Sequence, residues 1–126
     1  MAMNHINLEA MKSFAEEVKQ DPAKSKKVKK VECSWNFDEK KPQMESKLQH
    51  PKGETALHSD FAPFMGGSGS APDPIQYCLF GSAACFAATF MATATGMVIR
   101  IRGLWLSAEN SLDFGKTIGL TQKPVS

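Results

Sequence analysis

Twenty-five consecutive residues without a charged side chain, from Ile75 to Ile99, constrain this 126-residue chain more than any other feature. As a helix, such a stretch is long enough to span a lipid bilayer. It is rich in Ala, Gly, Ser and Thr, however, and these insert weakly into lipid compared with Leu or Phe. A helix that is apolar on all sides lies either in a membrane or inside a protein core. We therefore expect a buried helix of a soluble protein, covered in part by a second copy of the chain.

Local signals place this helix and a second, shorter one. Asp73-Pro74 predicts the start of the long helix, since Asp is a preferred N-cap and Pro is favoured at the first helical position. The helix is expected to run to about Thr95 and to stop at Gly96. The second helix is predicted over 8–20, where apolar residues recur on one face, and we expect it to serve as a packing or dimer-arm helix.

Alternating apolar and polar residues predict several strands, so we expect an α+β fold. The segment "KVECSWNF" reads as a half-buried strand with Cys33 facing the core, and "QMESKLQ" continues as a second strand after a turn near "DEKKP". A further short extended piece is expected in "ALHSDFAP". The pattern of "MVIRIRGLWLSAE" predicts another strand, and the last residues are expected to form a hairpin fragment.

Charge and composition exclude several classes of partner and site. The net charge of +2 is too small to indicate a nucleic-acid partner, and the run Lys24–Lys30 is expected to be a solvated strand edge. No apolar signal-peptide core is found at the N-terminus, which favours a cytoplasmic protein. No membrane partner is expected, because the small residues of the uncharged stretch insert weakly into lipid. The glycines between Gly66 and Gly69 fit neither phosphate-binding pattern. We expect no cofactor.

Three cysteines, Cys33, Cys78 and Cys85, form no CxxC pair, and their odd number argues against a disulfide scaffold. Cys78 and Cys85 share a helix face but lie roughly 10 Å apart along the axis, too far for a disulfide within one intact helix. The three histidines are scattered, so no metal site is expected. From the residues alone, buried structural cysteines are the plainest interpretation.

The segment from "GGSGSAPDPIQYCLFGSAACFAATFMATATGM" to "SLDFGKTIGL" resembles the OsmC-like family of osmotically induced and organic hydroperoxide resistance proteins. The family pattern is a Gly-rich loop, a helix-opening Pro, a Cys eleven residues later, and a Gly that ends the helix. Pro74, Cys85 and Gly96 match this spacing, as do Ala83 and Ala84.

The resemblance implies an intertwined homodimer of the OsmC-like fold, with two long central helices and strands from both chains around them. It implies a single domain over 1–126, in which 1–22 is an N-terminal helical extension and the C-terminal part of the family fold is absent. It also implies that Cys85 is the catalytic nucleophile, which attacks a small-molecule hydroperoxide and is then reduced by an external thiol.

Other features leave alternatives open. Ile75 stands where the peroxidases of the family have a Glu, no Arg precedes Arg100, and no cysteine occupies the resolving position. A non-catalytic OsmC-like dimer that binds a small apolar ligand, or a redox sensor based on Cys85, therefore remains beside the peroxidase hypothesis.

Overall fold

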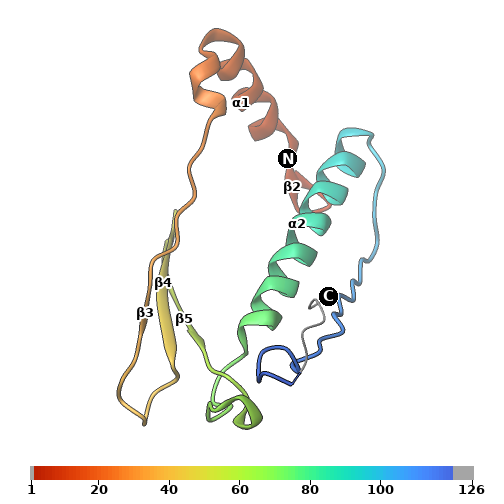
Figure 1. Cartoon of the computed structure of the whole chain (residues 1–126). Coiled ribbons are helices and arrows are strands. Elements are labelled where there is room, and N and C mark those ends of the chain that lie inside the picture. The colour runs from red at the N-terminus through yellow and green to blue at the C-terminus, as the bar shows by residue number, and fades with distance from the viewer. Residues whose placement is uncertain (1, 121–126) are drawn as a thin grey trace.

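The computed structural model describes residues 2–120 and shows an α+β chain with two α-helices and small antiparallel sheets (Figure 1). In chain order, its elements are β1 (Ala2–Met3), β2 (Ile6–Asn7), α1 (Leu8–Gln20), the 3-10 turn η1 (Pro22–Ser25), β3 (Cys33–Trp35), β4 (Met44–His50), β5 (Gly53–Ser59), the 3-10 turn η2 (Pro63–Met65) and α2 (Pro74–Gly96).

Both helices begin where the sequence predicts. The Asn7 side chain accepts a hydrogen bond from the backbone N–H of Ala10 and caps α1. At α2, the Asp73 carboxylate accepts from the N–H of Gln76, and the Gln76 side chain accepts from the N–H of Asp73, which completes a capping box. Two backbone donors at the start of α2 are thus satisfied without any tertiary contact.

The main sheet has the strand order β3-β4-β5, with every neighbouring pair antiparallel. Trp35 pairs with Met44, and Met44 with Ser59, in one cross-strand row. Since side chains alternate between faces, one face carries Trp35, Met44 and Leu57, while the opposite face carries polar residues. The three predicted central strands are confirmed, although β3 is shorter than the alternating segment "KVECSWNF" from which it was predicted.

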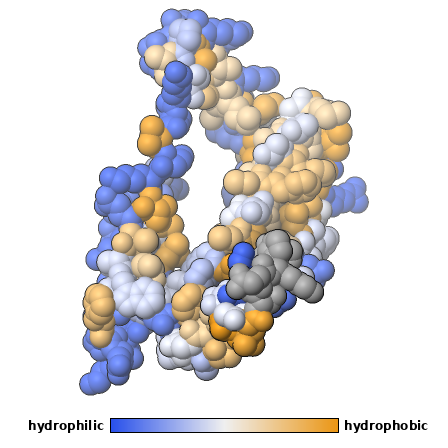
Figure 2. Space-filling model, in the orientation of Figure 1, coloured by the Kyte–Doolittle hydropathy of each residue, from blue (hydrophilic) through white to orange (hydrophobic). Residues whose placement is uncertain are grey.

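The chain has almost no core of its own. Among the described residues, Ala94 is the only buried hydrophobic residue, and Asp60 and Thr95 are the buried polar ones. Figure 2 shows an opening through the molecule between the sheet and α2, with apolar residues along the helix surface. The expected packing of a buried central helix on the strands is therefore not met within one chain.

The prediction of a strand from Val98 onward is wrong for the single chain. Residues 99–114 run extended along α2 without a strand assignment (Figure 1). From Arg102 to Phe114, no backbone N–H donates a hydrogen bond to the described backbone. A strand needs a neighbour to pair with, and the single chain offers none here.

The hairpin expected at the C-terminal end is not formed in the described residues. A turn, closed by a hydrogen bond from the N–H of Leu120 to the carbonyl of Gly115, lies in its place, and residues 121–126 lie outside the described part.

Asn4 ties the N-terminus to the end of α2. It occupies the turn between β1 and β2 with a positive φ of 56°. Its side-chain Nδ2 donates to Thr95 Oγ1 at 3.1 Å and to the carbonyl of Ile99 at 2.8 Å, while its Oδ1 accepts from the N–H of Ile101 at 2.8 Å. These bonds fix the direction in which the chain leaves the helix.

The C-terminal end of α2 carries strain at Val98. The N–H of Val98 donates to the carbonyl of Thr95, and the N–H of Ile99 donates to the carbonyl of Ala94, which together make a Schellman motif. That motif requires a left-handed residue, and Val98 fills the position with a φ of 59°. A β-branched residue is unfavourable there. Gly96, where the helix was predicted to end, lies two residues before this left-handed position and so cannot occupy it.

We predict that Val98→Gly stabilises the protein. The left-handed conformation costs an L-residue about 1–2 kcal/mol, whereas Gly adopts it freely and loses about 0.5–1 kcal/mol of backbone entropy on folding. The side chain of Val98 is 76% exposed, so little packing is lost. Thermal unfolding is the measurement, with Val98→Ala as the control, and a lower midpoint for Val98→Gly than for Val98→Ala would contradict the assignment of strain.

A buried carboxylate organises the loop that leads into α2. Asp60 Oδ2 accepts hydrogen bonds from the side-chain and backbone groups of both Ser68 and Ser70. These bonds, the Ser68 hydroxyl first, lower the pKa of Asp60 from 3.8 to about 2. A Cβ at Gly67 would lie 2.0 Å from the carbonyl oxygen of Phe61, so the loop also needs a glycine at this close approach.

The lowered pKa predicts a specific acid sensitivity. The stabilisation from the Asp60 carboxylate is fully present above pH 3.8 and is lost as the pH falls through about 2, because the folded state must then be protonated. Urea unfolding midpoints at pH 5, 3 and 2 should fall less steeply in Asp60→Asn than in the wild type. Glu39→Gln, in the turn after β3, is the control; equal slopes for the wild type and Asp60→Asn would refute the role of this carboxylate.

Candidate functional site

The candidate nucleophile Cys85 lies in the middle of α2 and is exposed in the single chain. The spacing of helical residues places it on one face with other small side chains: Cys78, Gly81, Ala88 and Ala92. Their separations of three and four residues alternate, as at the contact positions of two helices packed side by side. We call this surface the small-residue stripe.

The small-residue stripe suits close contact with another helix. Side chains of this size let two helix axes approach more closely than Leu or Phe does. Of the five residues, Ala92 is partly covered and the others are exposed. A thiol at the centre of such a stripe becomes part of an interface as soon as a second helix docks on it.

The chain by itself supplies no activating group for the thiol. In residues 2–120, Cys85 forms neither a hydrogen bond nor an ion pair, and no group of three or more metal-binding side chains is found. Cys78 and Cys33 are also free and exposed. The expectation that these cysteines are buried is therefore not met within one chain. What the chain provides is an accessible sulfur on a rigid helix.

An apolar cavity of about 350 Å³ lies against the second half of α2, and none of the stripe residues lines it. Its walls come from the second half of α2 and from the segment that returns along it: Phe86, Thr89, Phe90, Thr93, Ala94, Met97, Ile99 and Ile101. Thr89 is four residues after Cys85, one helical turn further along nearly the same face. The rings of Phe86 and Phe90 stack with their centres 6.3 Å apart. The sequence did not predict this cavity, because the residues from Val98 onward were assigned to a sheet.

A second cavity, of about 360 Å³, lies where α2 begins. Its lining joins the apolar face of the sheet to the first turn of the helix: Trp35, Gln43, Met44, Ser59, Asp60, Phe61, Pro74 and Tyr77. The Tyr77 hydroxyl donates to the carbonyl of His58 at 2.7 Å and links the helix to the end of β5. This is the point at which the sheet and α2 meet in one chain.

The helix α2 is long and apolar enough to cross a membrane, judged by length and composition, and little of it is buried in the chain. A core helix of a soluble protein passes the same test, so the finding is weak by itself. Two kinds of cover, a second protein surface or lipid, satisfy the physical requirement of this helix.

In comparisons with known proteins, the chain matches no protein-family model and no curated protein.

Proposed function

We propose that this chain is one protomer of an OsmC-like homodimer that reduces organic hydroperoxides with the thiol of Cys85. The observation that carries the proposal is the exposed small-residue stripe with Cys85 at its centre. A second copy docked on this stripe covers the helix and encloses the sulfur, and the apolar cavity against the second half of the same helix suits the organic part of a hydroperoxide.

The exposed area of the chain supports a large interface. Its accessible surface is 10593 Å², whereas a compact monomer of 13.8 kDa exposes about 6,600 Å² by the size scaling of folded proteins. The excess is about 4,000 Å² per chain, so two chains together expose about 8,000 Å² more than two compact monomers, which is enough surface for an interface of the size that obligate homodimers bury. The apolar face of the sheet, α2 and the unpaired segment after Val98 contribute to this excess, and all three gain cover when strands of both chains wrap the two helices.

The proposed reaction has two stages. The Cys85 thiolate attacks the terminal oxygen of the hydroperoxide, the O–O bond breaks, and the alkoxide leaves and takes up a proton to become the alcohol. The sulfur is thereby oxidised to a sulfenic acid. An external thiol then displaces the hydroxyl as water and forms a mixed disulfide, and a second external thiol releases Cys85 in its reduced form.

The thiolate requires a nearby positive charge. The stripe contains none, and Cys85 lies too far inside α2 for the helix N-terminus to act on it, because that effect is confined to the first turn. In the proposed dimer the second copy supplies the cation, from among the 13 Lys or three His of its own chain. The dimer and the activity are therefore one proposal with two separately testable parts.

The second candidate is a dimer that binds a small apolar molecule without reacting with it. The cavity between Phe86 and Ile101 favours this function, because its walls are almost wholly apolar. A redox sensor based on Cys85 would share the first oxidation step but needs no rapid turnover.

We predict that Cys85→Ser abolishes hydroperoxide consumption. The assay is the loss of an organic hydroperoxide in the presence of excess dithiol, with Cys33→Ser as the matched control because Cys33 is equally free and exposed. The wild type and the control should consume peroxide at rates at least tenfold above Cys85→Ser. Equal and near-zero rates in all three proteins would exclude the peroxidase and leave the binding protein.

We also predict that Ala88→Leu weakens the dimer. Ala88 is exposed in the chain, so a larger side chain fits the protomer but clashes with a helix docked on the stripe. Overpacking costs about 1–3 kcal/mol, which corresponds to about a 5- to 150-fold increase in the dissociation constant. Sedimentation equilibrium measures the mass, which should be twice 13.8 kDa in the wild type. Ala10→Leu, on the exposed surface of α1, is the control, and a wild type that is monomeric throughout refutes the dimer.

A further inference from the structure

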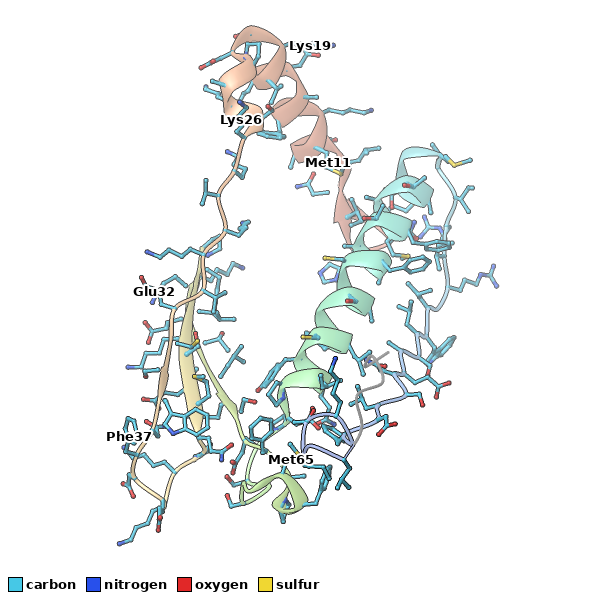
Figure 3. All side chains as sticks on the ribbon, viewed as in Figure 1. Met11, Lys19, Lys26, Glu32, Phe37 and Met65 are labelled. Carbon is cyan, nitrogen blue, oxygen red and sulfur yellow. The ribbon has the colours of Figure 1, made fainter. Side chains whose placement is uncertain are left out.

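The helix α1 presents an apolar stripe, and none of its residues is fully buried in the described chain. Its residues recur at helical spacing: Leu8, Met11, Phe14, Ala15 and Val18. Met11 is 46% exposed and Phe14 is 40% exposed. α1 and η1 form an arm that stands apart from the main sheet, as the labelled side chains of Met11, Lys19 and Lys26 show (Figure 3).

Positive and negative side chains of α1 lie at different angles around this apolar stripe. At about 100° per residue, Lys12 and Lys19 fall at the boundary of the apolar face, while the three glutamates of α1 fall on the opposite side: Glu9, Glu16 and Glu17. Lys19 also reaches Glu16 at 3.1 Å, but both side chains are well exposed, so this pair holds them only weakly. Cations therefore border the apolar stripe, and the glutamates face away from it.

The segment after α1 adds cations at the other border. The Nζ of Lys27 lies 5.2 Å from the centre of the Phe14 ring, so η1 and the residues after it fold back beside the stripe. Between residues 8 and 30 the chain has seven Lys and four acidic residues, a net charge of +3, whereas the whole chain carries only +2. The positive charge of the protein is thus concentrated on this arm.

We propose that the arm formed by residues 8–30 docks on an anionic lipid surface, with the apolar stripe in the acyl boundary and the lysines on the headgroup phosphates. An amphipathic helix with an apolar stripe and cations toward the membrane plane binds in this way, and a polybasic segment supplies the second attraction that stable binding needs. The 13 residues of α1 span roughly 20 Å at 1.5 Å per residue, too short to cross a bilayer, so the arm lies on the surface.

Charge also distinguishes this partner from the other candidates. Two copies that paired their stripes face to face would bring the bordering lysines of both chains together, which is unfavourable. A nucleic acid would bind the lysines through its phosphates but leave the apolar side chains of the stripe uncovered, whereas a lipid surface binds the lysines and covers the stripe. No membrane partner was expected from the sequence, because the uncharged segment 75–99 inserts weakly into lipid, and the lysines were assigned to a strand edge. The structure places residues 26–32 outside any strand. The inference stands independently of the hydroperoxide chemistry at Cys85.

Co-sedimentation of the full chain with vesicles tests the proposal. One set contains equal parts of phosphatidylglycerol and phosphatidylcholine, and the other contains phosphatidylcholine alone. We expect binding to the first set, at least tenfold weaker binding to the second, and loss of binding in 0.5 M salt, where surface charges are screened. Each lysine near an anionic surface contributes about a fivefold gain in affinity, so Lys26→Gln/Lys29→Gln should weaken binding about 25-fold.

Matched variants separate the arm from general charge. Lys40→Gln/Lys41→Gln removes two exposed lysines from the turn between β3 and β4, and should change binding less than twofold. Phe14→Ser should weaken binding at least tenfold, whereas Phe37→Ser, at another exposed ring, should not. Equal binding to both vesicle types, or an equal loss with the two lysine pairs, would overturn the proposal. So would a wild type that binds neither vesicle set and whose oligomeric mass changes in Phe14→Ser, because the arm would then be a contact between copies.

Discussion

The requirement that α2 be covered governs the whole structure. A helix of 23 residues that is apolar all round cannot remain in water, and in this chain the described residues leave most of it exposed. Local interactions hold the two ends of the helix. A capping box and the Asp60 loop hold its start, and the hydrogen bonds of Asn4 and the left-handed turn at Val98 hold its end. Its long sides are left for another surface, and we infer that this surface is a second copy.

The sequence predicted the elements whose signals are local. Asn7 and Asp73 are N-caps that act within one turn of the chain, so the starts of both helices followed from residue type alone. The alternation around Trp35 likewise predicted a strand there and a second strand after the turn, and these pair as β3 and β4, although β3 is exposed rather than half-buried. The thiol at Cys85 was found by resemblance, and the structure adds that it lies at the centre of a stripe of small residues.

Features that depend on distant parts of the chain were not predictable in this way. The alternation from Val98 onward is typical of a strand, but a strand also needs a partner, and the described chain has none at that place. The apolar cavity beside Phe86 exists only because this segment returns along the helix. Lys27 was assigned to a strand edge, since nothing local indicated that it folds over Phe14. In each case, the local sequence does not indicate which segments, distant in the chain, come into contact in the folded structure.

Hydrogen–deuterium exchange in residues 102–108 tests the central claim most directly. The backbone amides of this segment donate no hydrogen bond within the described chain, so in a single chain they exchange at the rate of an unstructured peptide. We predict that they pair with strands of a second copy and exchange at least a hundredfold more slowly at high protein concentration, with protection that is lost on dilution. Exchange at the unprotected rate at every concentration would contradict it.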